Sequence, residues 1–258
     1  MMKTLYLAWQ DPVDRMWRTV GRLTLDNGKY KFVYTKGAKN APRFSTFGGM
    51  KKLDQPYEST ELFPVFANRL LSERRPEYED YLKWANLSRH DITGVLSATG
   101  GKRVTDSFRV FPKPEPTPEE RYEVTFFAHG LRYFPEEARR RVDALQAGER
   151  LYLMPDPQNE YDPMAILLRT GDPLFLAGYC PRFFATDFKQ LLQLNPDQPA
   201  VVVIRVNRDA PLQMRLLCRL SSPWPAGFET CSGEEYKPLV EEPTVVGRVQ
   251  PWKWTQKT

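Results

Sequence analysis

The first half of the chain contains the pattern of a β-hairpin. Two strand-like runs, residues 17–25 and 29–35, flank the dipeptide Asn27-Gly28, which favours a tight turn between antiparallel strands. Every second residue of the later run is aromatic: Tyr30, Phe32 and Tyr34. Alternation with a period of two places these rings on one face of a strand. The sequence therefore predicts a hairpin with one aromatic face.

Two helices are predicted after this hairpin. The first covers residues 62–71, which are mostly apolar. The second opens at Pro76, a residue suited to the first turn of a helix. Its apolar residues recur at i, i+3, i+4 and i+7, the spacing of one helical face: Tyr78, Tyr81, Leu82 and Ala85. Strands followed by helices predict a small α+β domain.

The second half shows six strand patterns and two helix patterns. The strands are expected at residues 123–128, 151–154, 165–169, 174–180, 199–207 and 213–220, and the helices at 135–146 and 182–192. Many short strands with few helices favour a small barrel or a strongly curled sheet. The whole chain is therefore predicted to be α+β, with a β-rich second domain.

Prolines separate the two halves. Four of them occur within seven residues, at positions 112, 114, 116 and 118. Proline lacks a backbone N–H and interrupts both helices and sheet ladders, so this segment is expected to be a stiff, extended spacer. We predict four parts: a domain over residues 1–111, a linker over 112–120, a second domain over 121–222 and a C-terminal extension over 223–258.

Charge is distributed unevenly along the chain. The net charge is +5. Residues 1–120 contain 20 Lys and Arg against 15 Asp and Glu, whereas residues 121–222 contain 13 against 12. The second domain is almost neutral, so a nucleic-acid partner cannot be argued from net charge alone. No apolar run approaches the length of a membrane span, and a cytoplasmic protein is expected, associated with the nucleoid if it is bacterial.

Residues suited to catalysis or metal binding are scarce. Cys180, Cys218 and Cys231 form no CxxC pair, and His90 and His129 complete no ligand spacing. The sequence contains neither a phosphate-binding loop nor a GxSxG or HExxH motif. We expect a protein that binds rather than catalyses, with no cofactor and no metal.

Three short segments of the second half carry the strongest signal. They are Gly130-Leu-Arg-Tyr133, the segment around Asn159-Glu-Tyr-Asp-Pro163 and Gly178-Tyr-Cys-Pro-Arg182. In this order and spacing the stretch over about residues 122–222 resembles the HIRAN family. The resemblance implies an OB-like barrel that binds DNA and holds the 3′ end of a single strand, as at stalled or damaged forks.

Five residues match the family's DNA-contacting positions: Arg132, Tyr133, Asn159, Tyr161 and Asp162. The two tyrosines offer ring faces on which bases can stack, and Arg132 can reach a phosphate. By the same resemblance, Asp162 is expected to accept a hydrogen bond from a terminal 3′-hydroxyl, and Asn159 to hold the adjacent sugar–phosphate. Tyr179, by contrast, is expected to be a core residue.

An alternative remains open for the middle segment. Asn and Asp side chains often bond to their own backbone, and Pro163 favours extension at Asp162, so this stretch is also typical of an ordinary turn. Glu160 and Pro163 depart from the family pattern, which usually has a small or apolar residue and a polar residue at these positions. Both departures weaken the expectation of specificity for DNA ends more than that of DNA binding.

The first half is similar to the N-terminal subdomain of HipA-type toxin kinases. The similarity covers about residues 4–90 and is carried by Val20-Gly-Arg-Leu23, Lys31-Phe-Val-Tyr34 and the segment 62–71. It implies a protein-interaction domain over residues 1–111, whose partner is a HipA-like kinase, a helicase or a nuclease. The leading hypothesis is a DNA-binding adaptor; the alternative is an antitoxin-like or inhibitory partner subunit of such a kinase.

Overall fold

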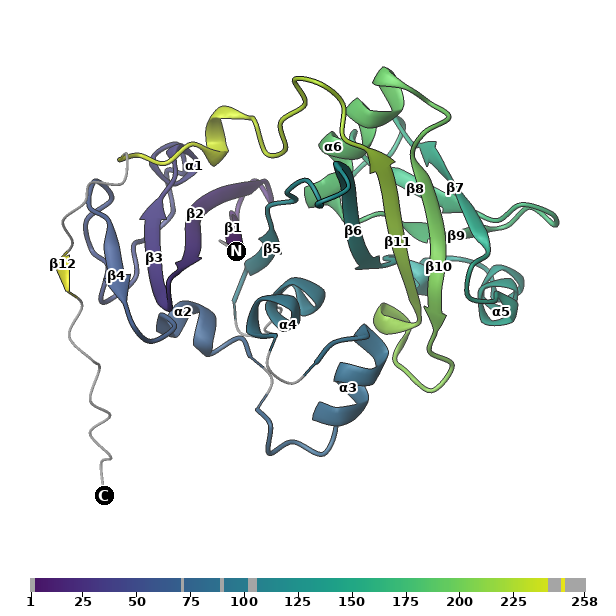
Figure 1. Cartoon of the computed structure of the whole chain (residues 1–258), viewed down its shortest axis with the longest axis horizontal. Helices are drawn as coiled ribbons and strands as arrows, with labels where there is room; N and C mark the ends of the chain where they lie inside the picture. The colour runs from purple at the N-terminus through teal and green to yellow at the C-terminus, as the bar shows by residue number, and fades with distance from the viewer. Residues whose placement is uncertain (1–2, 71, 89–90, 102–105, 241–246, 249–258) are drawn as a thin grey trace. The chain divides into compact units, whose positions relative to one another are not determined.

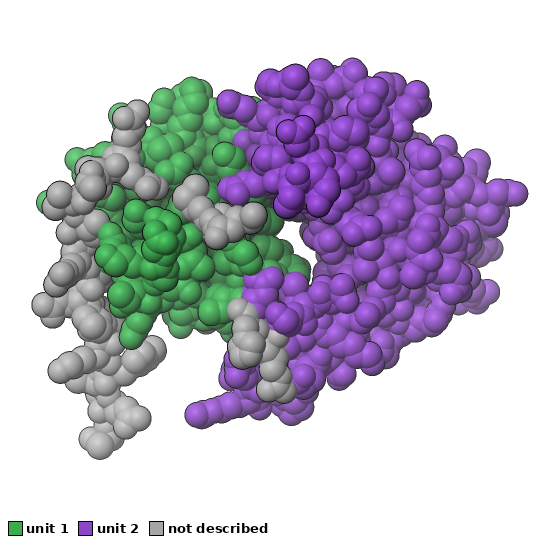
Figure 2. Space-filling view, viewed as in Figure 1, with its two compact units in different colours: residues 1–71, 92–113, 231–258 green, residues 72–91, 114–230 purple. Residues whose placement is uncertain are grey.

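The computed structural model describes residues 3–70, 72–88, 91–101, 106–240 and 247–248. The chain divides into two compact units, and both are assembled from separate stretches of sequence. Unit 1 contains residues 1–71, 92–113 and 231–258, and unit 2 contains residues 72–91 and 114–230 (Figure 2). The predicted four-part division stays a prediction, but the chain passes between the units more often than that division implies.

Unit 1 is built on a six-stranded sheet in the order β12-β4-β3-β2-β1-β5 (Figure 1). Its elements are β1 (Lys3–Gln10), β2 (Trp17–Asp26), β3 (Lys29–Tyr34), α1 (Lys36–Lys39), β4 (Tyr57–Ser59), α2 (Pro64–Ala67), α4 (Ile92–Thr99), β5 (Phe108–Pro112), η3 (Glu234–Tyr236) and β12 (Gly247–Arg248). The strands pair antiparallel except β12, which runs parallel to β4. Apolar side chains form the core of this unit. The largest of them include Phe32, Tyr34 and Phe66, all fully buried.

The predicted hairpin is confirmed. Strands β2 and β3 pair antiparallel, and Asn27 and Gly28 between them both have positive φ. Positive φ at two successive turn residues is the geometry that Asn-Gly adopts most easily. The predicted helix over 62–71 is much shorter, because after Asn68 the N–H groups of Arg69 and Leu70 bond to carbonyls three residues back, in tight turns.

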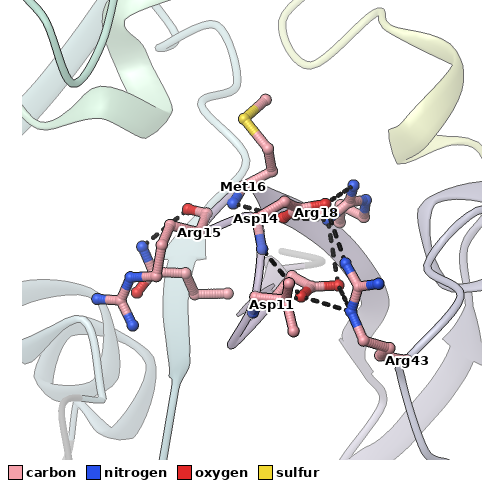
Figure 3. A network of polar contacts seen from close by, with 8 residues as sticks. Asp11, Asp14, Arg15, Met16, Arg18 and Arg43 are labelled. Atoms are coloured by element: carbon pink, nitrogen blue, oxygen red, sulfur yellow. Dashed lines mark hydrogen bonds and ion pairs between the residues drawn. The ribbon is translucent and has the colours of Figure 1, made fainter.

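The loop between β1 and β2 is organised by a buried carboxylate (Figure 3). Asp11 is completely buried, accepts hydrogen bonds from the N–H of Val13 and the Nε of Arg43, and lies 3.7 Å from Arg18. Arg18 in turn donates to Asp14 at 2.8 Å. These bonds fix a turn that leaves two apolar side chains in solvent, Val13 and Met16.

Unit 2 is a curled six-stranded sheet in the order β6-β11-β10-β7-β8-β9. Its elements are α3 (Tyr78–Ala85), β6 (Arg121–Phe127), η1 (Leu131–Tyr133), α5 (Glu136–Ala144), β7 (Arg150–Pro155), β8 (Ile166–Arg169), β9 (Leu176–Tyr179), α6 (Arg182–Leu194), β10 (Ala200–Val206), η2 (Leu212–Met214) and β11 (Leu216–Pro223). All six predicted strands and both predicted helices of this half are present. The curled antiparallel sheet fits an OB-like fold.

One core serves this unit. It contains alternate residues of the strands, the buried face of α6 and the aromatic residues Trp224 and Phe228 from beyond β11. The tryptophan lies 6.0 Å from the Tyr122 ring, centroid to centroid. The first part of the predicted C-terminal extension therefore belongs to this core. Residues 231–239 continue along unit 1, where Lys36 contacts Glu234 and the N–H of Leu239 donates to Tyr34.

Helix α3 joins unit 2 through the end of β10. Its predicted apolar face is confirmed, because Tyr78, Tyr81, Leu82 and Ala85 are all buried. The amide of Asn207 donates to the carbonyl of Trp84 at 3.0 Å, and Arg205 donates to that of Lys83. The helix therefore belongs to unit 2, although it precedes the proline-rich segment in sequence.

Candidate nucleic-acid interface

The two edges of the unit 2 sheet meet at an isolated bridge between His129 and Tyr179. Each residue donates its N–H to the other's carbonyl at 2.8 Å, which joins the end of β6 to the end of β9. The flanking glycines permit this approach. Both have positive φ, and a Cβ would lie 3.1 Å from the Tyr179 ring at Gly130 and 2.9 Å from the His129 carbonyl at Gly178. The bridge therefore places the first motif segment beside the third.

The middle segment is tied to the same tyrosine. Asn159 Nδ2 donates to Asp156 at 3.1 Å and to the Tyr179 hydroxyl at 3.3 Å. Its Oδ1 accepts from the N–H groups of Tyr161 and Asp162, each at 3.0 Å. An amide side chain offers two donor hydrogens and two acceptor lone pairs, so every position of Asn159 is used within the loop. The turn that the sequence left as an alternative is present, and Asn159 shapes it.

Asp162 lies at the junction of this loop with α6. Its Oδ1 accepts from the N–H of Met164 at 3.0 Å, and its Oδ2 is 3.3 Å from Arg182 Nη2. The Asp162 side chain is 17% exposed and the Arg182 side chain 38%. Both side chains are therefore partly accessible to solvent. The sequence did not single out Arg182, although it ends the third motif segment.

Two aromatic rings of the predicted site are open to solvent. Tyr133 is 72% exposed and Tyr161 is 89% exposed, which is unusual for large apolar side chains. The Arg132 guanidinium lies over the Tyr133 ring, 4.5 Å from its centroid. This contact holds a cation on one side of an exposed ring.

Tyr179 belongs to the third motif segment and contacts residues beside the first segment and in the middle one. Its ring stacks on Phe134, next to the first segment, at 5.9 Å and 24°. Its hydroxyl donates to Asp156 at 3.0 Å and accepts from Asn159. Burial raises the pKa of the Tyr179 phenol, and the Asp156 carboxylate raises it further. The expected core role was incomplete: the ring is half-buried, whereas the hydroxyl belongs to the loop network.

Of the five predicted residues, the structure joins Asn159 and Asp162 directly and links both to the third segment. It leaves the side chains of Arg132, Tyr133 and Tyr161 exposed at the surface. Sequence reasoning missed Tyr179 and Arg182 as members of the site, although both stand in the third motif segment. Within the described residues, no group of histidine, cysteine and carboxylate side chains is placed to hold a metal ion. The described part of the chain also contains no helix that is long and apolar enough to span a membrane.

Two of three comparisons with known proteins find a match for part of this chain. The comparison with curated proteins gives no match. A crystal structure of a protein from Lactobacillus plantarum is 21% identical, with a TM-score of 0.33, and the alignment covers 40% of this chain and 96% of that one. Residues 122–224 match the HIRAN domain. These residues contain all three motif segments, and because the HIRAN domain is generally a DNA-binding module, the match supports a DNA-binding role for the second half of the chain.

Proposed function

We propose that unit 2 binds the 3′ end of single-stranded DNA and that the protein acts without catalysing a reaction. The observation that carries this proposal is the meeting of three motif segments at Tyr179. Beside the network that joins them, the surface offers exposed rings, a guanidinium and a solvent-accessible carboxylate. These are the groups that a DNA terminus requires: ring faces for bases, a cation for phosphate and an acceptor for the terminal hydroxyl.

Stacking would supply most of the binding free energy. Tyr133 and Tyr161 can each receive a base, with about 1–3 kcal/mol per stacked base. Arg132 is already held against the Tyr133 ring and can bind the phosphate next to a stacked base. Neither interaction depends on sequence, so we expect binding that tolerates different bases.

The Asp162–Arg182 pair would recognise the terminus itself. The carboxylate can accept a hydrogen bond from the 3′-hydroxyl while the guanidinium binds the preceding phosphate. Asn159 has no hydrogen-bonding position left for DNA, so we assign it the shaping of the loop instead of a contact with the sugar–phosphate. Glu160 is exposed and would face solvent or the strand.

The adaptor role, with residues 1–111 as a protein-interaction domain, belongs to this proposal. The similarity of the first half to HipA-type kinases stays a prediction, as does the alternative of an inhibitory partner subunit. Co-purification of a kinase-like protein with the full chain would favour that alternative.

The proposal is tested by fluorescence polarisation with two single-stranded oligonucleotides that differ only in a 3′-hydroxyl or a 3′-phosphate. A terminal phosphate removes the donor and adds a charge of about −1.5 to −2. Loss of a charge-assisted hydrogen bond is worth about 1.5–3 kcal/mol, so the 3′-phosphate strand should bind at least about tenfold more weakly. Asp162→Asn can still accept from the Met164 N–H and should abolish most of this preference.

Tyr133→Leu is the matched control, because it removes a stacking ring but leaves the groups that recognise the terminus unchanged. Because stacking ignores the end group, this variant should weaken both oligonucleotides by the same factor. Equal affinities of the wild type for both ends, unchanged in Asp162→Asn, would show that the segment 159–163 is a structural turn only.

A further inference from the structure

The sheet of unit 2 has a second face that the 3′-end site does not use. Successive residues of a strand point to opposite faces, and the core residues Leu151, Val201 and Cys218 define the inner one. Their neighbours Arg150, Val202 and Arg219 therefore lie on the other face. The register aligns them in one row, because Val202 pairs with both Arg150 and Arg219.

The row continues onto the next strand. Tyr152 follows Arg150 on the same face of β7 and pairs with Arg169 of β8. Arginine side chains thus occupy β11, β7 and β8, within four neighbouring strands of the sheet order β11-β10-β7-β8 (Figure 1). With strands about 4.8 Å apart, the distance across the sheet from β11 to β8 is roughly 14 Å.

Tyr152 holds two of these arginines in place. The guanidinium carbon of Arg169 lies 4.5 Å from its ring centroid, and that of Arg150 lies 5.3 Å from it. Both distances are within the range of cation–π contacts. Arg169 also donates to the Thr170 carbonyl at 3.1 Å. Two guanidinium groups thus contact one tyrosine ring that is partly open to solvent.

The three arginines have no carboxylate partner within the part of the chain that the structure describes. Two acidic residues near them in sequence or register are engaged elsewhere: Glu149 pairs with Arg141 at 3.0 Å, and Glu123 accepts from Ser221 at 2.9 Å. Arg150 and Arg219 are exposed, and Arg169 is half-buried. A nearly neutral domain therefore presents an unpaired row of positive charge.

We propose that this row, Arg150, Arg169 and Arg219 around Tyr152, binds the phosphate backbone of duplex DNA. Guanidinium groups bind phosphates through charge-assisted hydrogen bonds. Platforms for single strands combine a basic groove with several aromatic faces on which successive bases stack, whereas this row has three arginines and one tyrosine that already contacts two of them. A rigid array of cations on a sheet suits phosphates that a duplex holds at fixed spacing. This surface goes beyond the proposed 3′-end site, since it shares none of that site's residues.

The experiment measures binding of the full chain to a short blunt duplex whose 3′ ends both carry phosphates, at several salt concentrations between about 0.05 and 0.2 M. Blocked ends keep the proposed 3′-end site from contributing. The test variant combines Arg150→Gln, Arg169→Gln and Arg219→Gln. The matched control combines Arg139→Gln, Arg140→Gln and Arg208→Gln, which removes the same charge from other parts of unit 2. Thermal melts establish that both variants are folded.

The test variant should bind the blocked duplex at least about tenfold more weakly than the wild type. Each phosphate contact contributes about 0.9 to the slope of log K against log salt, so its slope should fall by about 2–3. The control should stay within about twofold of the wild type. A short single strand with a 3′-hydroxyl should bind equally to the test variant and the wild type, which separates this surface from the 3′-end site.

Three results would overturn the proposal. The wild type could fail to bind the blocked duplex, or the two triple variants could weaken equally, in which case only total charge matters. Polyglutamate could compete as well as the duplex does, which would identify the surface as one for acidic proteins. A result in which Asp162→Asn loses 3′-hydroxyl recognition but still binds the blocked duplex like the wild type would support the proposal that the arginine row is a separate surface.

Discussion

Single side chains hold the candidate interface together, and Tyr179 is the central one. Its backbone closes the two edges of the sheet, its ring stacks on Phe134, and its hydroxyl bonds to Asp156 and Asn159. None of these contacts involves a neighbour in sequence. Tyr179 therefore joins its own segment to two others that are distant in sequence.

Tyr179→Phe removes the hydroxyl and keeps the ring. We expect the free energy of unfolding to fall by about 1 kcal/mol, the usual net value of a hydrogen bond, and the affinity for a 3′-hydroxyl strand to fall with it. Denaturant titration and fluorescence polarisation measure the two effects. Tyr161→Phe, in which an exposed hydroxyl is removed, is the control and should change stability by less than about 0.5 kcal/mol.

The stability that the Tyr179 hydroxyl contributes should depend on pH in the alkaline range. Burial and the Asp156 carboxylate raise the pKa of its phenol. A raised folded-state pKa means that the stabilisation is complete below the ordinary tyrosine value of about 10 and is lost as the pH rises through the folded-state value. A Tyr179→Phe variant as stable as the wild type below that range would contradict this assignment.

At the scale of elements, the loop between β1 and β2 is stabilised by ion pairs and hydrogen bonds of Asp11 and Asp14. Burial alone would raise the pKa of Asp11, but hydrogen bonds from Arg43 and from the backbone of Val13 lower it. The hydrogen bond from Arg18 lowers the pKa of Asp14 to about 2. Both carboxylates are therefore ionised when the loop is folded, and the turn depends on their charge.

Asp14→Asn should lower the free energy of unfolding near neutral pH. The variant should also lose less stability than the wild type when the pH falls. Because the folded-state pKa of Asp14 is depressed to about 2, its contribution is present above the unfolded value of about 3.9 and is lost as the pH falls through about 2. Melting temperatures of wild type and variant should therefore converge over this window. Arg18→Gln should show the same convergence, and a constant difference between variant and wild type across the window would contradict the role of this pair.

At the scale of the whole molecule, each unit is formed from separate stretches of the chain, yet each has its own hydrophobic core. The core of unit 2 extends from Tyr122 to Phe228, whereas that of unit 1 uses residues from Leu5 to Val110, with Leu239 packed against them. Residues 114–230 therefore contain a complete core and, with it, all three motif segments.

Residues 114–230 expressed alone should unfold in one cooperative transition. Its midpoint should lie below that of the corresponding transition in the full chain, because Asn207 and Arg205 lose their partners in α3. Calorimetry of the fragment and of the full chain makes the comparison. An aggregated or non-cooperative fragment would show that α3 is essential to the core, and that the boundary near residue 114 does not separate independent folding units.

The amino-acid sequence determined the features that depend on neighbours in the chain. The Asn27-Gly28 turn and the apolar face of α3 both follow from local spacing, and the structure confirms them. The order of the three motif segments likewise sufficed to indicate the HIRAN domain. Strand β1 was missed, because six of its eight residues are buried and such a strand shows no alternation.

Tertiary structure alone decided which distant groups meet. Only folding shows that β6 and β9 close on Tyr179, that Asn159 uses all its hydrogen bonds within the loop and that Arg182 joins Asp162. The row of arginines is likewise invisible in sequence, where Arg150 and Arg219 are 69 positions apart. The physical reason is the same in each case. Strand register and sheet closure depend on the free energy of the whole fold, so no local pattern can specify which side chains they bring together.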